Sequence, residues 1–293
     1  MSEARRGMGL MATAMVIWAF LEAIAASVMR TYSPFQVVWT RYAVHLAFML
    51  AVWGWRAPSS LWRTERPMFQ LVRSSLMLIM PASWVIARRL GVHDAELMSL
   101  FWLAPMMICA LGGALLRERI EWQHWCAAAL LYMGTVVALE PRSVPDWPAL
   151  LAPIVMGFTF AAYVVMTRSL RSDTTRANLF YTALGVFVLL TPVMPAVWVP
   201  PTVEDFAVLT IVGLLGWIGL WVLDRMAGAG PVSVSAPFAF AQIPVLLAMG
   251  WVTEGDRPDR RGLVGSLLIA LVLGWFWLRG REMQDGANLE RAA

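Results

Sequence analysis

The sequence is built from long apolar segments that recur about every 25 to 30 residues, and this recurrence constrains the fold more than any other feature. A helix needs about 20 apolar residues to cross a lipid bilayer, and each segment is close to that length. Stretches such as LLAPIVMGFTFAAYVVM are continuously apolar, whereas strands of a membrane barrel are about ten residues long and alternate polar with apolar residues. We therefore predict an all-α, polytopic membrane protein. Its ten transmembrane helices are expected at residues 8–29, 35–54, 68–87, 95–116, 122–140, 148–168, 177–198, 204–224, 231–253 and 262–279.

Composition agrees with a lipid environment and excludes several kinds of chemistry. Hydrophobic residues make up 59% of the chain and charged residues 14%, whereas soluble domains are roughly one quarter charged. All 23 basic residues are arginine, so the chain has no lysine for a Walker phosphate loop or a Schiff base. ATP-driven pumps, pyridoxal enzymes and retinal proteins are therefore excluded. The first segment has a second interpretation, a cleaved signal peptide, because Arg5 and Arg6 precede it and Ala23 and Ala25 form an A-x-A pattern.

The arginines are distributed unequally between alternate loops. With the N-terminus in the cytoplasm, fourteen arginines fall on the cytoplasmic side and seven on the opposite side, while Arg41 and Arg73 fall within or at the edge of helices. This bias predicts a multi-pass protein of the bacterial inner membrane with both termini cytoplasmic. Because the arginines are spread over many loops, they favour contact with anionic lipid headgroups, and no nucleic acid partner is expected.

The segment LEPRSVPDWP at 139–148 divides the ten predicted helices into two sets of five. We therefore expect a first repeat at residues 1–142 and a second at 143–293, which together form one transmembrane domain. Because each repeat has an odd number of spans, the second must enter the membrane with the opposite orientation. Two inverted five-helix repeats are typical of transporters that work by alternating access.

Four stretches resemble the EamA-type branch of the drug/metabolite transporter superfamily. SPFQVVWTRYAVHLAFML is similar to that family's second helix, with Arg41 at its usual arginine, and LFWLAPMMICALGGALLRERIEW is similar to its fourth, with Pro105 and Glu118. GAGPVSVSAPFAFAQIPVLLAMGWVTEGDRPD, followed by LVGSLLIALVLG, is similar to the ninth and tenth. The spacing departs from the pattern there, because Pro244 precedes Glu254 by 10 positions whereas Pro105 precedes Glu118 by 13. The resemblance implies a secondary transporter of small metabolites, driven by a proton or substrate gradient.

Glu22 is the most informative polar residue, because it lies within the apolar stretch AMVIWAFLEAIAASVM. An ionised side chain at a helix centre costs about 2.5 to 3.5 kcal/mol on insertion scales. Burial among apolar atoms favours the neutral carboxyl, so Glu22 could exchange a proton or hold a substrate amine. Alternatively, it is a structural group satisfied by an arginine such as Arg41. The stretch AFLEAIAASVMRTYSPF also resembles the first helix of small multidrug resistance proteins, whose membrane glutamate binds protons and cationic drugs.

Other polar or amphipathic residues could line a cavity with Glu22. Trp18 lies one helical turn before Glu22 and could contact a cationic or aromatic solute, although ordinary packing explains it equally well. Arg41 and His45 are one turn apart and could present a guanidinium and a titratable imidazole to a solute, or Arg41 could be a structural tether. The remaining predicted substrate-binding or coupling residues are Ser83, Trp84, Trp102, Thr159, Tyr163 and Gln242.

Two transport functions remain open from the sequence. The first is a secondary exporter of amino acids or related small metabolites by alternating access, with proton coupling as a further possibility. The second is a proton antiporter for aromatic or cationic drugs. An enzyme is not expected, because no H-E-x-x-H motif or comparable catalytic spacing occurs, and no cofactor is implied. The histidines His45, His93 and His124 are too scattered to predict a metal site. Both a monomer and a homodimer fit the sequence.

Overall fold

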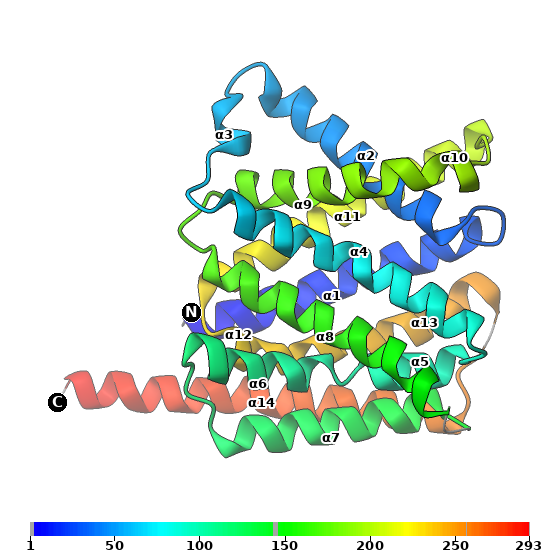
Figure 1. Cartoon of the computed structure of the whole chain (residues 1–293). Helices are drawn as coiled ribbons and strands as arrows, with labels where there is room; N and C mark the ends of the chain where they lie inside the picture. Colours follow the sequence, from blue (N-terminus) through cyan, green and yellow to red (C-terminus); the bar gives the residue numbers. More distant parts are fainter. Residues whose placement is uncertain (1–2, 143–145, 256, 293) are drawn as a thin grey trace.

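The computed structural model describes residues 3–142, 146–255 and 257–292, and every regular element in these ranges is a helix (Figure 1). The prediction of an all-α fold is confirmed. In the first half the helices are α1 (Glu3–Val28), α2 (Pro34–Met49) with the π-helical turn η1 (Leu50–Gly54), α3 (Ser59–Trp62), α4 (Pro67–Arg89), α5 (Asp94–Phe101), α6 (Ala104–Leu116) and α7 (Trp122–Leu139).

The second half has the same order of long helices. They are α8 (Trp147–Ser169), α9 (Thr175–Leu190) with η2 (Thr191–Val193) and α10 (Met194–Val197), α11 (Val203–Ala229), α12 (Val232–Ser235) with η3 (Ala236–Ala241) and α13 (Gln242–Glu254), and α14 (Arg260–Ala292). The expected segments all correspond to helices. The largest differences are at three ends: α1 begins five residues before its expected start, α11 continues five residues beyond its expected end, and α14 continues past its apolar segment.

Nine helical segments in the described part of the chain are long and apolar enough to cross a membrane. α7, which the sequence predicted as a further crossing, is not among these nine; it has 18 residues, and Gln123 and His124 lie in its first turn. It lies along α14 (Figure 1). The two helices approach closely because Gly134 faces Gly265: a Cβ atom on Gly134 would lie 3.2 Å from the carbonyl oxygen of Gly265.

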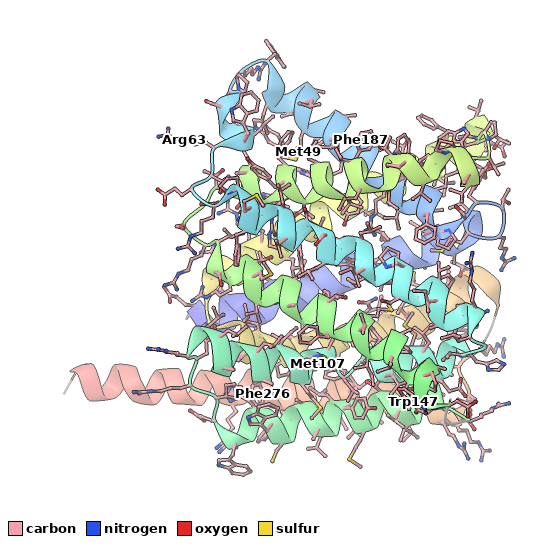
Figure 2. All side chains as sticks on the ribbon, viewed as in Figure 1. Met49, Arg63, Met107, Trp147, Phe187 and Phe276 are labelled. Carbon is pink, nitrogen blue, oxygen red and sulfur yellow. The ribbon has the colours of Figure 1, made fainter. Side chains whose placement is uncertain are left out.

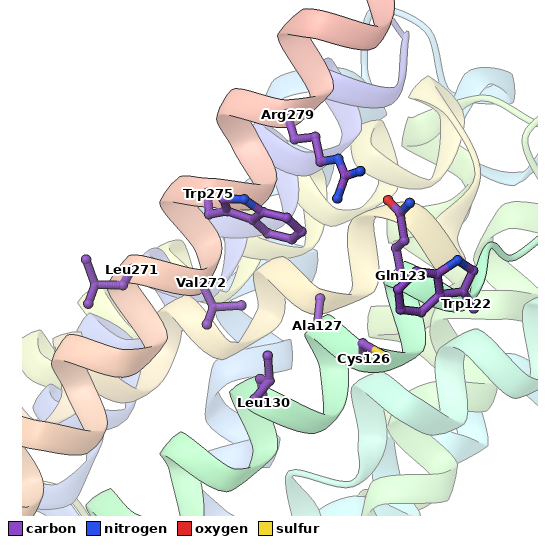
Figure 3. A pocket seen from close by; sticks show the side chains of 9 residues that line it. All are labelled: Trp122, Gln123, Cys126, Ala127, Leu130, Leu271, Val272, Trp275 and Arg279. Atoms are coloured by element: carbon purple, nitrogen blue, oxygen red, sulfur yellow. The ribbon is translucent and has the colours of Figure 1, made fainter.

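An apolar groove of about 310 Å³ also runs between α7 and α14, and Figure 3 shows its lining side chains. Leu130 and Leu271 lie in its apolar part, and both are exposed on the surface of the bundle. Arg279 and Gln123 face each other near one end, beside the indoles of Trp122 and Trp275 (Figure 3). Exposed leucine and tryptophan side chains on this flank are suited to contact with lipid.

Hydroxyl side chains define where three of the helices begin. Ser33 accepts a hydrogen bond from the Gln36 N–H at 3.2 Å, and Pro34 follows at the first helical position of α2. Thr174 and Thr202 cap α9 and α11 in the same way. Such caps satisfy backbone N–H groups that have no partner inside the helix, which matters most near a membrane.

Several packing contacts between helices of the two halves have an equivalent contact in which the two halves trade roles. α1 packs against α11, and α8, the counterpart of α1, packs against α4, the counterpart of α11. Likewise α1 packs against α13 and α8 against α6, while α2 packs against α11 and α9 against α4. Two inverted repeats produce such pairs of equivalent contacts. The residue at which one repeat ends and the next begins remains a prediction.

The fourth crossing of each half is broken in the middle. α5 ends at Phe101, and α6 begins at Ala104 with Pro105 at its second position. In the second half, the 3₁₀ segment η3, which contains Pro237, separates α12 from α13. Proline removes a backbone donor and its ring clashes with the carbonyl four residues earlier, so these breaks have a local cause. By contrast, α4 stays continuous through Pro81.

Candidate functional site

A cavity of about 420 Å³ lies between α1, α2, α4 and α5, with α8 and α11 contributing one residue each. It extends to Arg30, in the connection between α1 and α2, and to Asp94, the first residue of α5, and both are exposed. This connection and the start of α5 lie at the end of the bundle opposite the two chain termini (Figure 1). The cavity is therefore open on that side. Of the predicted site residues, Trp18, Glu22, Arg41 and Trp84 line it.

Glu22 reaches this cavity from α1 and is held by a residue of the broken ninth crossing. The Gln242 side chain is buried and donates a hydrogen bond from Nε2 to Glu22 Oε2 at 2.9 Å. Gln242 is the first residue of α13, directly after η3. The Glu22 carboxyl group is thus hydrogen-bonded to the residue at which this crossing changes from 3₁₀ to α geometry.

Arg41 supplies a positive charge to the same cavity from α2. Its Nη2 donates to the Tyr42 hydroxyl at 3.1 Å, and its guanidinium carbon lies 4.7 Å from the centre of the Tyr42 ring. Its Nε is buried and has no hydrogen-bond partner within the described residues. No ion pair joins it to Glu22 within 4.0 Å in this part of the chain, although Arg41 acts electrostatically on that carboxyl.

The position of Arg41 depends on small residues in α11. A Cβ atom on Gly216 would lie 3.0 Å from Arg41 Cδ, and one on Gly213 would lie 2.6 Å from Val44 Cβ. The absence of side chains at these positions lets α2 approach α11 closely enough for the arginine stem to lie across it. Small residues commonly permit such close helix contacts in membranes.

The rest of the cavity wall is mainly apolar and combines aliphatic side chains with two tryptophans and five methionines. Trp18 packs edge-on against Phe160, with 6.3 Å between ring centres, and Trp84 lies on α4. Indole rings attract cations and stack on flat solutes, and thioethers are polarisable and adapt their shape. The methionines in the wall are Met29, Met77, Met80, Met98 and Met156.

The other predicted site residues are buried in helix packing and do not line this cavity. His45 stacks near Tyr42 at 6.2 Å, and its Nε2 has no partner among the described residues. Trp102 packs against Phe240 with 5.7 Å between ring centres, and Ser83 is buried within α4. Their proposed contact with a solute remains a prediction, as it does for the four residues that line the cavity.

Thr159 and Tyr163 also face the interior of the bundle. Thr159 donates to the carbonyl oxygen of Met156 at 2.9 Å, and the Tyr163 hydroxyl lies 3.3 Å from the hydroxyl of Thr182. These bonds satisfy their polar groups within the protein, as burial in an apolar medium requires.

At the end of the bundle near the termini, a buried arginine joins three long helices. Arg73 of α4 donates to the Thr167 hydroxyl at 3.0 Å, to Gln70 Oε1 at 2.7 Å and to the carbonyl oxygen of Asn178 at 2.7 Å. Its guanidinium carbon lies 5.0 Å from the Tyr163 ring centre. The contacts connect α4 with α8 and α9, so they hold this end of the bundle together.

Two carboxylates extend this network. Asn178 Nδ2 donates to Asp224 Oδ1 of α11 at 2.8 Å, and Gln70 Nε2 donates to Asp173 Oδ2 at 3.1 Å. None of these residues was among the predicted site residues. The available signal was the presence of Arg73 and Asp224 within apolar segments, where charged side chains are costly and usually paired.

Glu118, the glutamate of the family resemblance, forms a second connection at this end. Its carboxylate accepts bonds from the Val232 N–H at 3.0 Å and from the Ser233 N–H and hydroxyl at 2.9 and 2.6 Å. Arg168 of α8 lies 3.9 Å away. Glu118 therefore ties the end of α6 to the start of α12, and both broken crossings are held at the side opposite the open cavity.

Metal binding is not indicated by this arrangement. Within the residues that the structure describes, no group of three or more histidine, cysteine or acidic residues could hold a metal ion.

Comparison with known proteins gives a family match and several similar transporters. The profile of the EamA-like transporter family matches residues 5–139. An S-adenosylmethionine uptake transporter of Rickettsia felis is 23% identical over 262 residues, which cover 86% of this chain and 88% of the relative. A riboflavin transporter of Vibrio cholerae is 24% identical over 269 residues, or 89% of each protein. The first half of the chain therefore matches the EamA-like transporter family, and most of its length is similar to named transporters.

A solved crystal structure has the same fold as this chain. It superposes with a TM-score of 0.79 over 94% of this chain and 98% of the other, at 20% sequence identity. The matched family and the named relatives are transporters, and the described part of this chain has several helices that are long and apolar enough to cross a membrane.

Proposed function

We propose that this transporter moves a small organic solute that carries both a positive and a negative group together with a flat or apolar body. The observation that supports this proposal is the placement of Glu22 and Arg41 in one cavity without a direct ion pair. A solute ammonium or sulfonium group would lie near Glu22, and its carboxylate would face Arg41, whose planar fork suits carboxylates. The indoles and thioethers of the wall would contact the body.

The named relatives fit this class to different degrees. S-adenosylmethionine has a sulfonium group, an amine, a carboxylate and a flat adenine, so it could use every part of the cavity. Riboflavin is flat but has no charged pair, so it would use the aromatic wall alone. Amino acids, favoured by the sequence analysis, share the amine and carboxylate. The proposed class therefore includes amino acids and S-adenosylmethionine and ranks riboflavin lower.

The mechanism that we propose is alternating access. The cavity is open at the side opposite the termini, while the Arg73 and Glu118 contacts close the other side. The arginine distribution favours cytoplasmic termini in a bacterial inner membrane, so this conformation would face outward. Release of the Glu118 contacts would let the broken crossings move and open the cytoplasmic side, as in other inverted-repeat transporters.

Proton coupling through Glu22 is part of the proposal. The Glu22 carboxylate can accept from Gln242 and from a solute cation, but a protonated carboxyl loses the charge that attracts the cation. Solute and proton would therefore compete for Glu22. Direction of transport follows from the gradients in this scheme and not from the cavity.

A panel of labelled compounds in proteoliposomes tests the solute class. S-adenosylmethionine, aromatic amino acids, riboflavin and tetraphenylphosphonium would be compared for the native chain, Glu22→Gln and Arg41→Gln. Transport of a zwitterionic solute should be lost in both variants. The second candidate, a drug antiporter, is favoured by Glu22 and the indoles. It should transport the phosphonium cation, and this transport should be lost in Glu22→Gln and retained in Arg41→Gln. Transport of riboflavin alone, unchanged in both variants, would contradict the charge-pair proposal.

A further inference from the structure

A second polar cavity of about 390 Å³ lies at the end of the bundle near the chain termini, well separated in its lining from the Glu22 cavity. It is formed where α2, η1 and α3 meet the start of α9 and the end of α11; Met49, labelled in Figure 2, lies in its wall. Its lining also includes two arginines and three tryptophans: Arg176, Arg225, Trp53, Trp217 and Trp221. Nothing in the proposed transport cycle uses this cavity.

Two arginines from different helices face this space. The Arg176 guanidinium carbon lies 5.1 Å from the Trp53 ring centre, and that of Arg225 lies 5.3 Å from the Trp221 ring centre. Neither arginine forms an ion pair within 4.0 Å in the part of the chain that the structure describes. An arginine stacked on an indole keeps the N–H groups at its edge available, and that edge matches the oxygens of a phosphate group.

An indole in the same wall has a buried donor with no acceptor. Trp217 Nε1 is buried, and no hydrogen-bond partner exists for it among the described residues. Its ring is fixed against Phe48 and Trp53, with ring centres 4.6 and 6.2 Å apart. Buried N–H groups almost always have an acceptor, so an oxygen-bearing ligand in the cavity would satisfy this one.

The surrounding charges leave the cavity positive. α9 is 16 residues long and directs its N-terminal end, where the backbone dipole is positive, toward the cavity. Among the described residues of the lining, none is acidic: Asp224 and Asp173 lie outside it, where Asp224 accepts bonds from Asn178 and Thr175 and Asp173 accepts a bond from Gln70. An anion entering the cavity would therefore meet Arg176 and Arg225.

We propose that this cavity binds a phosphate group, with its oxygens held by Arg176 and Arg225 and one oxygen accepting from Trp217 Nε1. The group comes either from the headgroup of an anionic phospholipid or from a soluble phosphate compound. The tryptophans of the wall favour the lipid, because indoles prefer the boundary between headgroups and hydrocarbon. Anionic lipids of the cytoplasmic leaflet are also attracted to juxtamembrane arginines.

Native mass spectrometry of the purified full chain tests the site with defined probes. Phosphatidylglycerol and phosphatidylcholine would be titrated onto the native chain, the double variant with Arg176→Gln and Arg225→Gln, and the variant Trp217→Phe. The native chain should bind phosphatidylglycerol more tightly than phosphatidylcholine. Loss of two charge-assisted contacts should weaken phosphatidylglycerol binding by about tenfold or more. Trp217→Phe, which keeps the ring packing, should weaken it less, and Arg171→Gln, an exposed arginine outside the lining, should bind as the native chain does.

Inorganic phosphate distinguishes the two sources. Thermal unfolding in detergent would be compared with and without phosphate at constant ionic strength. Stabilisation of the native chain but not of the double variant, without a preference for phosphatidylglycerol, identifies a soluble phosphate ligand. Selective phosphatidylglycerol binding without a phosphate effect identifies the lipid. The proposal is overturned if the double variant and Trp217→Phe bind phosphatidylglycerol and respond to phosphate as the native chain does, or if the native chain neither prefers phosphatidylglycerol nor is stabilised by phosphate.

Discussion

Replacing Arg73 with methionine removes a buried guanidinium that joins α4 to α8 and α9. The native side chain is 1% exposed and donates three hydrogen bonds, to Thr167, Gln70 and the carbonyl of Asn178. Methionine has a similar stem but no donor. These three acceptors would lose a partner, and Asp224 would lose the nearby positive charge.

The expected loss of stability follows from the number of bonds. Hydrogen bonds between membrane helices contribute about 0.6 kcal/mol on average and up to about 1.7 kcal/mol. Three of them give roughly 2–5 kcal/mol, which agrees with the range for removing one partner from a buried charged network, about 3–5 kcal/mol. For a chain of this size, each kcal/mol corresponds to roughly 2 °C in apparent Tm. We therefore expect Arg73→Met to lower the Tm by about 4–10 °C.

Thermal unfolding in detergent, followed by tryptophan fluorescence, measures this loss. Arg89→Met is the matched control, because Arg89 is an exposed arginine at the end of the same helix and should change stability by less than about 0.5 kcal/mol. Adding Asp224→Asn to Arg73→Met should cost less than the sum of the single changes, since both act on one network. Equal Tm values for Arg73→Met and Arg89→Met would refute the stabilising role of the buried network.

Two further changes test the helix contacts. Gly213→Ala should destabilise the chain by about 1–3 kcal/mol, because its Cβ would overlap Val44 across the contact between α11 and α2. The control Gly228→Ala should be neutral or stabilising, because a Cβ there would have no neighbour within 4 Å. Similar Tm values for the two variants would contradict the close packing. Glu118→Gln should raise hydrogen exchange of the 232–233 amides by roughly tenfold, because a charged acceptor is lost. Glu121→Gln is the control there, and unchanged exchange in Glu118→Gln would show that this carboxylate does not hold α12.

The transmembrane segments could be located from the sequence because the bilayer imposes both their length and their apolar character. The positions of the breaks in the fourth and ninth crossings could also be predicted from the sequence, since Pro105 and Pro237 lie at them. The end of α11 was placed too early because the boundary was drawn at Asp224, a charged residue that the structure satisfies inside the bundle. Hydropathy treats such a residue as a helix end even when it has a buried partner.

The candidate site was harder to predict, because the helices are apolar on all sides and their periodicity does not mark the face toward the cavity. Glu22, Trp18, Arg41 and Trp84 line the cavity, whereas residues of similar character such as Trp102 are buried in packing. The Arg73 network was missed because its members come from helices far apart in the sequence. Only the packing of α4 against α8 and α9 brings them together.

We propose that a solute crosses through the Glu22 cavity in exchange with protons. Counterflow of the panel compound that the native chain moves fastest would be measured in proteoliposomes with and without an imposed pH gradient. We expect the gradient to change the native rate, and we expect Glu22→Gln to lose transport of a zwitterionic compound. A Glu22→Gln variant that transports at the native rate with the native response to the gradient would contradict the coupling through Glu22.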